Sequence, residues 1–519
     1  MGTIRPQKLR RTPGFWQQVS ELPIFLLAFG IAAISMLVPA LHGLILEDFI
    51  AARMFFYASI LGTILFALIG IALSGREPAT GPLGPLLSLF SIMVILPVGL
   101  AVPFFEALRT TAFFNAYLEM VSAITTTGAP VFDDPTRLSD TLHLWRAQVA
   151  WMGGFVMWVA AVAILAPLNL GGFEVTARAE PGQSQDDAAR IDRADTHKRL
   201  IRSAGALLPI YVGLTLLLWV VLLAAGDRSL VALVHAMSVM STSGISPIDG
   251  PATAGSGLTG EILLVLFMVF AVSRLTFSTD TVTVVGKGLH TDPEIQLAVA
   301  IVVSVPLLLF LRHWAGAFEV DQEEDIVSAA LGLWGSFFTV TSFLSTTGFV
   351  SSHWGAAQGW SGLETPGLIL MAVALVGGGV ATTAGGVKLL RVFALYRHGL
   401  REMDRLVYPS SVSGARGQGR RLQRQGAFIA WIFFMLFALS LTAVSLLLAS
   451  LGLGFEEAMV LSVAGLANTG PLIDAAGENP IPMVELSGGA KAVFCAAMVV
   501  GRMETLAIIA LLTPELWRT

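Results

Sequence analysis

The chain has 519 residues, of which 55% are hydrophobic and only 13% are charged, and its formal net charge is −5. The apolar share exceeds the roughly 45–50% found in soluble proteins, and the mean hydropathy is +0.75. An ordinary soluble domain is therefore excluded, and a membrane protein is predicted.

The apolar residues occur in runs, and several runs approach the about 20 residues that cross a bilayer as a helix. In chain order the runs cover 24–46, 55–73, 86–105, 207–225, 262–272, 297–311, 368–376 and 428–448. Shorter runs can extend through Gly, Ser and Thr. We expect about ten crossings.

Lys and Arg are concentrated in the N-terminal segment, in 178–202, in 391–424 and at Arg518. Acidic segments such as 319–325 contain few of them. Since positive charge marks the cytoplasmic side, we expect a multi-pass protein with both termini in the cytoplasm. The basic segments also suit membrane lipid, because anionic headgroups attract them.

A short motif of hydroxyl residues and glycine occurs four times, at 122–129, 238–245, 342–349 and 464–471. Each copy follows a half-apolar stretch too short to span a bilayer and lies between spanning runs. One such cluster is most simply a turn. Four copies at equivalent places predict a repeated unit of helix, pore helix, extended strand and helix.

The chemistry of the motif favours a monovalent cation. Non-helical backbone at membrane depth must be buried or line a cavity, and its carbonyls can replace the hydration shell of an ion. The four copies contain no carboxylate, which a divalent ion would favour. The predicted filter residues, acting mainly through backbone carbonyls, are Thr126, Thr127, Gly128, Thr242, Ser243, Gly244, Thr346, Thr347, Gly348, Asn468, Thr469 and Gly470.

The predicted fold is an all-α polytopic membrane protein with two extra N-terminal helices and four helix–pore loop–helix repeats around a central pore, in pseudo-fourfold arrangement. The expected boundaries are 1–80 for the N-terminal pair, 81–180 for repeat 1, 181–290 for repeat 2, 291–408 for repeat 3 with an intramembrane loop, and 409–519 for repeat 4.

Two features interrupt apolar segments. Five glycines in residues 377–386 would break a straight helix. Arg502 lies in the apolar stretch 492–512 and should face the protein interior, because an ionisable residue inside a membrane is expensive. The glycines are alternatively close-packing positions. Arg502 alternatively pairs with Glu504 or with a carbonyl, and Lys388 is alternatively the first basic residue of the cytoplasmic side.

The sequence resembles the Trk, Ktr and HKT superfamily of potassium transporters, in particular the bacterial Trk membrane subunit. Besides the four motif copies, the resemblance rests on segments 144–154, 400–409, 501–505 and 513–518. The two initial helices resemble the extra pair of Trk proteins. Because glycine fills the selectivity position of all four copies, the resemblance implies K⁺ as the permeant ion, bound at the filter residues, with no covalently bound cofactor.

The resemblance also implies a gate. An intramembrane loop below the filter would face Arg502 and obstruct the pore, and its residues would be Gly377, Gly378, Gly379, Thr382, Thr383, Gly385 and Gly386. Smaller residues than Thr382 and Thr383 are expected from the family pattern. The implied function is potassium uptake through a gated, channel-like pore; the alternative is a symporter coupled to protons or sodium.

The implied partners are a second copy, forming a homodimer, and a cytoplasmic regulatory subunit that binds NAD(H) or ATP/ADP, in a bacterial inner (plasma) membrane. No dinucleotide-binding Gly-x-Gly-x-x-Gly follows a strand-like run, so nucleotides would act through the partner, and no nucleic acid is expected. Paired metal ligands, Gly-x-Ser-x-Gly and a Walker sequence are absent, so an enzyme is not predicted. Glu119, His235 and Asp280 near the pore helices form either structural hydrogen bonds or a proton relay.

Overall fold

The structure is a computed structural model, and it describes residues 22–73, 83–132, 134–168, 172, 196–273, 292–316, 326–362, 366–407, 418–477, 479–504 and 508. Within these residues every regular element is a helix, and the predicted all-α class is confirmed. The predicted domain boundaries after residues 80, 180, 290 and 408 lie outside the described residues.

The helices follow one another in four similar groups after an N-terminal set. The N-terminal set is α2 (Ile24–Ser35), α3 (Leu37–Ile45) and α4 (Phe49–Leu73). The first group is α5 (Leu83–Val94), α6 (Leu96–Leu108), α7 (Phe113–Ile124), α8 (Asp140–Ala160) and the π-helical turn η2 (Ala161–Leu165). The second is α10 (Thr196–Ala224), α11 (Ser229–Ser241), α12 (Gly257–Met268) and the turn η6 (Val269–Ala271).

The third group is α13 (Pro293–Gly316), α14 (Ile326–Leu344), α15 (Trp354–Ser361), α16 (Gly367–Val376) and α17 (Leu389–Val407). The fourth is α18 (Gln418–Ser450), α19 (Phe455–Leu466), the short α20 (Leu472–Ala475) and α21 (Gly488–Met503). Helix α21, which carries Arg502, ends at Met503, and Glu504 has a positive φ of 61°.

In the described part of the chain, seven helices are long and apolar enough to cross a membrane, and shorter apolar helices accompany them. The seven are Ile24–Ile45, Phe49–Leu73, Gly84–Leu108, Asp140–Leu165, Lys198–Ala224, Pro293–Arg312 and Gly426–Ser450. The run predicted at 368–376 corresponds to α16, which ends at Val376, because the chain turns into a loop at Gly377, whose φ is 70°.

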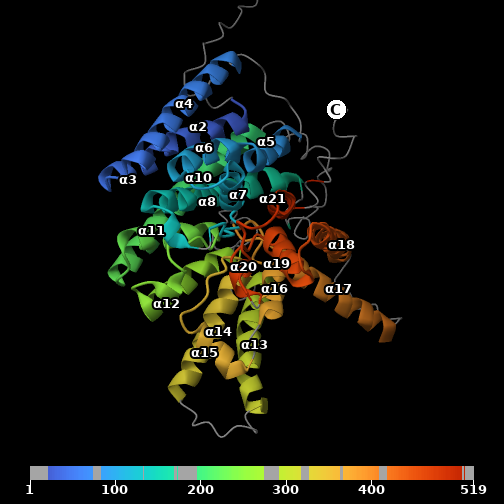
Figure 1. Ribbon diagram of the computed structural model, residues 1–519. Coiled ribbons are helices and arrows are strands. Elements are labelled where there is room, and N and C mark those ends of the chain that lie inside the picture. The colour runs from blue at the N-terminus through green and yellow to red at the C-terminus, as the bar shows by residue number, and fades with distance from the viewer. Residues whose placement is uncertain are drawn as a thin grey trace, which may run out of the picture.

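The groups pack in chain order, and the last closes on the first. Helix α8 packs on α11, α12 on α14, α16 on α19, and α21 returns to α7. Figure 1 shows this order as colours running around the molecule from blue through green and yellow to red. The closed order places α7, α11, α14 and α19, the short helices that precede the four motifs, on the inner side of the assembly.

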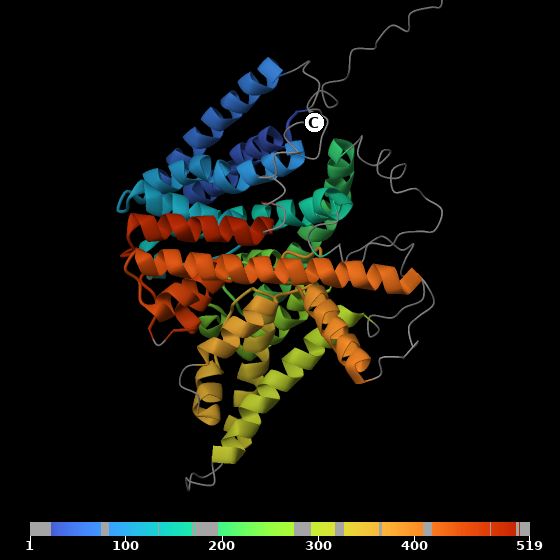
Figure 2. The same cartoon turned by 90° about the vertical axis from the view of Figure 1, so that its right-hand side faces the viewer.

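The N-terminal helices pack against α5, α6 and α8 of the first group. Trp145 of α8 contacts Phe55 of α4 edge-on, with ring centroids 5.3 Å apart, and its Nε1 donates to Leu100 O at 3.3 Å. The amide of Gln148 donates to Ser35 O at 2.8 Å. These bonds satisfy polar groups that lipid cannot satisfy. They hold the N-terminal helices on the outside of the bundle, as Figure 2 shows for α4.

Candidate functional site

Each of the four motifs ends its short helix with the same pair of backbone hydrogen bonds. Thr127, Ser243, Thr347 and Thr469 each donate at 2.9 Å to the carbonyl five residues earlier. The residue before each of them donates to the carbonyl three residues earlier, at 2.9–3.2 Å. This pair of bonds is the Schellman motif, which satisfies carbonyls at a helix C-terminus. Four helices thus end without exposing these groups to lipid.

The Schellman motif requires one left-handed residue, and here that residue is never glycine. The φ angles are 54° at Thr126, 55° at Thr242, 59° at Thr346 and 52° at Asn468. A left-handed residue other than glycine costs about 1–2 kcal/mol, and for a β-branched residue the conformation is a genuine outlier. Strain of this kind is retained at functional sites, so its recurrence at four equivalent positions marks the motifs as one site.

The four segments meet at a common centre through their glycines. A methyl group placed on Gly128 would lie 1.6 Å from Ser243 O, and one on Gly244 would lie 2.1 Å from Thr347 O. A methyl group on Gly348 would lie 2.8 Å from the Pro471 side chain, and one on Gly470 would lie 2.1 Å from the Ala129 nitrogen. Segment 1 therefore contacts 2, 2 contacts 3, 3 contacts 4 and 4 contacts 1. The four motifs form a closed ring of backbone that excludes larger residues.

Pairs of hydroxyl groups form hydrogen bonds within three of the four segments of this ring. Thr127 Oγ1 lies 2.8 Å from Thr125 Oγ1, and the equivalent pairs Ser241–Ser243 and Ser345–Thr347 lie at 3.1 and 2.9 Å. Sequence reasoning omitted Thr125, Ser241 and Ser345 from the site, although their recurrence two residues before the braced hydroxyl is visible in three of the four motifs.

Three buried side-chain oxygens of the motifs have no hydrogen-bond partner in the described structure, namely Thr126 Oγ1, Ser342 Oγ and Asn468 Oδ1. The amide nitrogen of Asn468 donates to Thr127 Oγ1 at 3.0 Å and to Met498 O at 2.9 Å. Burying an unpaired oxygen is unfavourable. These uncharged oxygens are therefore suited to a ligand that accepts their lone pairs, such as a cation or a water molecule.

The glycine-rich segment 377–388 forms a loop directly against this ring. Its ends are joined by backbone bonds from Val387 to Leu375 O and from Lys388 to Val376 O, both 2.9 Å long. Gly385 N donates to the side chain of Thr346 at 2.8 Å, so the loop binds a left-handed residue of the third motif. A methyl group on Gly385 would lie 2.0 Å from Ala467 O, so close backbone approach requires this glycine.

Arg502 of α21 holds the loop from the side. The residue is 4% exposed, and its Nη1 donates to Thr383 O at 2.6 Å. Of the alternatives considered from the sequence, the carbonyl contact is therefore present. The carboxylate of Glu504 instead forms a 2.6 Å ion pair with Arg391. Lys388, left open as a first cytoplasmic residue, is 8% exposed and donates through Nζ to Ala384 O.

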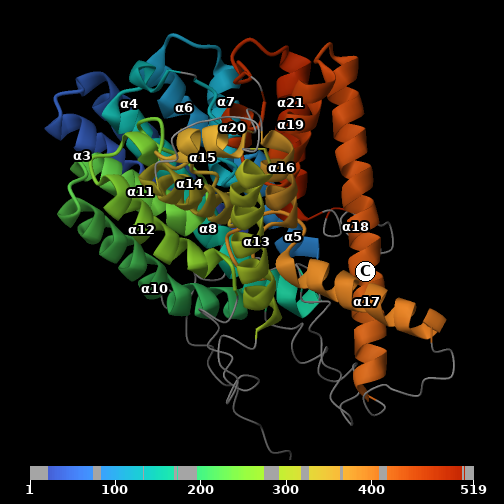
Figure 3. The ribbon, with the colours of Figure 1, turned by 90° about the horizontal axis from the view of Figure 1, so that it is seen from below.

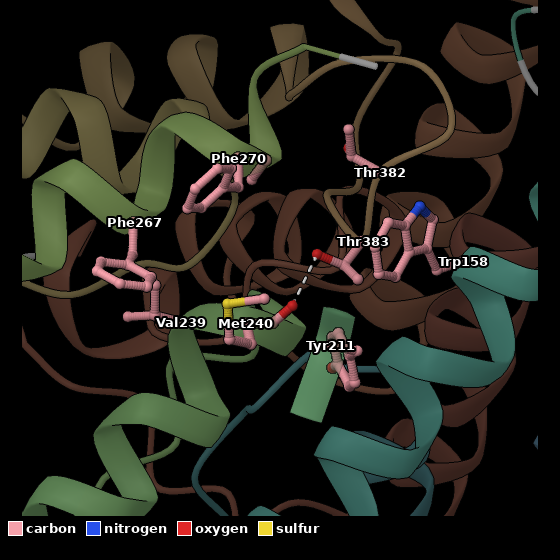
Figure 4. A pocket seen from close by; sticks show the side chains of 9 residues that line it. Trp158, Tyr211, Val239, Met240, Phe267, Phe270, Thr382 and Thr383 are labelled. Carbon is pink, nitrogen blue, oxygen red and sulfur yellow. Dashed lines mark hydrogen bonds between the residues drawn. The ribbon is translucent and has the colours of Figure 1, made fainter. Parts of the chain in front are cut away.

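Two small hollows adjoin the loop. One is lined by aromatic residues with Thr382 and Thr383. In Figure 4 Thr383 donates to Met240 O beside Trp158 and Tyr211, and the bond is 3.3 Å long. The other hollow is lined by Asn468, Lys388 and Arg502, so it adjoins the fourth motif directly.

Buried polar side chains form hydrogen bonds with the segments that follow the motifs. Glu119 forms an ion pair with Arg146 and accepts from Val131 N at 3.3 Å. His235 Nε2 lies 2.9 Å from Ser246 Oγ. These contacts accord with a structural role for both residues, and Asp280 lies outside the described residues.

Glu261 of α12 is a further buried acid that sequence reasoning missed. It is 0% exposed and accepts hydrogen bonds from Trp334 Nε1 at 2.7 Å, Ser351 Oγ at 2.8 Å, and both the backbone N and Oγ of Ser352 at 2.7 and 2.8 Å. It thereby joins the second group to the segment after the third motif. A lone carboxylate within an apolar helix was the available indication.

We predict that Glu261→Gln destabilises the folded protein by about 2 kcal/mol, because hydrogen bonds to a charged group contribute about 1.5–3 kcal/mol. Thermal denaturation of the purified variant in detergent measures the change. Glu106→Gln, at a half-exposed residue with a 3.9 Å ion pair, is the control and should leave the midpoint unchanged. An unchanged midpoint for Glu261→Gln would show that these bonds contribute little.

The fold and the ring define the class: a multi-pass helical membrane protein in which four segments that follow helix ends pack against one another in a ring. A family model described as TrkH, cation transport protein, matches residues 94–252 and 295–517. The chain belongs to this family of cation transport proteins, which confirms both the resemblance found from the sequence and the expectation that the chain is a transport protein, not an enzyme.

Named relatives agree. The chain is 32% identical over 416 residues to the Trk system potassium uptake protein TrkI of Halomonas elongata, and the aligned residues cover 78% of each chain. It is 28% identical over 423 residues to the Trk system potassium uptake protein TrkH of Salmonella typhimurium, covering 80% of this chain and 82% of that one. The crystal structure of the potassium transporter TrkH from Vibrio parahaemolyticus matches with a TM-score of 0.77 and 25% identity, covering 96% of this chain and all of that one.

Proposed function

We propose that the chain carries K⁺ into the cell through a gated, channel-like pore whose selectivity filter is the ring of four motifs. The observation that carries this proposal is the closed ring itself, in which four segments with equivalent left-handed residues pack against one another in turn. Carbonyl oxygens at such a centre replace the water around a dehydrated cation.

Potassium fits this site better than a divalent ion. The ring offers carbonyl, hydroxyl and amide oxygens and no carboxylate, whereas Ca²⁺ favours carboxylates. The relatives TrkI and TrkH are named as potassium uptake proteins. The driving force would be the membrane potential, about 2.3 kcal/mol per charge for each 100 mV, so uptake needs no chemical step by the protein.

The glycine-rich loop and Arg502 are the proposed gate. The loop contacts the ring through Gly385 and Thr346, and Arg502 binds its Thr383 carbonyl from the other side. A guanidinium buried at this depth repels K⁺ strongly, because charges interact more strongly in a medium of low dielectric constant than in water. Opening would require the loop and Arg502 to separate.

Control by a cytoplasmic subunit that binds NAD(H) or ATP/ADP remains part of the proposal and follows from the family resemblance. The same holds for a homodimer, for a bacterial inner membrane location and for cytoplasmic termini. The basic segments 178–202 and 391–424 supply positive charge on the side where such a subunit would bind.

The direct test is ion uptake by liposomes that contain the purified full chain. We expect a K⁺ gradient to drive accumulation of a potassium tracer that excess K⁺ abolishes and equal Na⁺ leaves largely intact. Liposomes without protein supply the background. Uptake equal to this background in both the parent and Arg502→Ala, in proteins that keep the thermal denaturation midpoint, would refute potassium transport by this chain.

Gly128→Ser should weaken selectivity for K⁺ over Na⁺ by about tenfold or more. A side chain at this position would meet Ser243 O at 1.6 Å, so the neighbouring carbonyl must move. The ratio of K⁺ to Na⁺ uptake measures the effect. Gly213→Ser is the matched control, because a methyl group there meets nothing within 4 Å. An unaltered ratio for Gly128→Ser would mean that the first motif does not set selectivity.

Arg502→Ala should raise K⁺ flux in the absence of any partner by about tenfold, because it removes both the buried charge and the bond to Thr383 O. Arg502→Lys retains the charge and should keep flux low. Equal flux in the parent and in well-folded Arg502→Ala would exclude Arg502 from the gate.

A further inference from the structure

Lys388 occupies a position in the loop that its sequence context does not explain. It is the last residue before α17, is 8% exposed, and has a positive φ of 83°. Left-handed backbone is unfavourable for a lysine. The backbone N–H of Lys388 donates to Val376 O at 2.9 Å. Its side chain points inward, and the ammonium group donates to Ala384 O.

Two adjacent loop carbonyls are therefore each bound by a different cationic side chain. Thr383 O accepts from Arg502 at 2.6 Å, and the next carbonyl, Ala384 O, accepts from Lys388. Both side chains line the same small hollow, together with Asn468 of the fourth motif. The two cations therefore lie on one side of the ring, beside the fourth motif.

The acidic residues near the loop do not cancel this pair of charges in the hollow. Glu504 also lines the hollow, but its carboxylate is bound at 2.6 Å by Arg391, whose guanidinium lies 3.6 Å from the Phe433 ring centroid. Glu294 of α13 accepts from Val380 N at 2.9 Å, on the part of the loop that precedes Thr383. The hollow itself thus retains excess positive charge.

We propose that Lys388 is a second barrier residue of the gate, whose ammonium group occupies the Ala384 carbonyl and so denies it to a passing cation. This inference rests on the proposed function. An ammonium group and K⁺ both bind carbonyl oxygens, so the tethered group takes the place that a passing ion would use. It also repels that ion at short range. Because Lys388 belongs to the loop, its barrier moves with the loop, whereas Arg502 acts on the loop from α21.

The test compares K⁺ uptake by liposomes containing purified full-length variants without any partner. Lys388→Met keeps the length of the side chain and removes the charge, and it should raise flux on the order of tenfold. Lys388→Gln is a second neutral replacement with the same expected direction. Lys388→Arg keeps the charge and should leave flux low, a result that loss of packing alone would not produce.

Lys491→Met is the matched control. Lys491 is also a buried lysine, 6% exposed, and also donates to a carbonyl, Val484 O at 2.7 Å, but it does not line the hollow. Flux in Lys491→Met should stay at or below that of the parent. An equal rise in Lys491→Met would overturn the inference, because loss of any buried lysine would then open the pathway.

The two proposals fail in different ways. If neither the parent nor Arg502→Ala transports K⁺, the proposed function fails. If Arg502→Ala raises flux while folded Lys388→Met and Lys388→Gln leave it unchanged or lower it, potassium transport stands and the barrier role of Lys388 is overturned. A rise in both neutral variants, reversed in Lys388→Arg, supports Lys388 as a barrier residue.

Discussion

The structure depends on one constraint: non-helical backbone inside a membrane must be satisfied within the protein. Four short helices end in the interior, and each solves the problem with the same two hydrogen bonds and one left-handed residue. The solution is strained at Thr126, Thr242 and Thr346, since threonine disfavours this conformation. Repeating it four times around one centre leaves a ring of backbone whose remaining oxygens are suited to a cation.

The same constraint explains the charges around the glycine-rich loop. This loop is also irregular backbone among apolar helices, and its polar groups are bound by side chains instead of by a regular ladder. Glu294 accepts from a loop N–H, while Arg502 and Lys388 donate to loop carbonyls. Residues that satisfy the loop thereby place positive charge beside the ring, so in the proposed gate the stability of the loop and its resistance to cations would have one origin. Figure 3 shows α17, which follows the loop, running crosswise to α18.

The sequence predicted the all-α class, the short helices before each motif and the family, because hydropathy and a fourfold motif are properties of residue order. Only the resemblance to a known family predicted that Gly385 and Arg502 lie near each other. The left-handed conformation of Thr126 and its equivalents was not predictable, since threonine has no local preference for it. Glu261 was missed and the role of Lys388 was left open for a different reason: their partners, Ser352 and Ala384 O, are set by how the loops fold and not by hydropathy.

The central claim is that the ring selects K⁺ in a passive pathway, and the reversal potential of the purified full chain in planar bilayers tests it most directly. The bilayer would separate a K⁺-rich solution from a Na⁺-rich one, at two pH values and without a partner. The account predicts a reversal near the K⁺ equilibrium potential that does not change with pH. A reversal that follows the Na⁺ or proton gradient would contradict it.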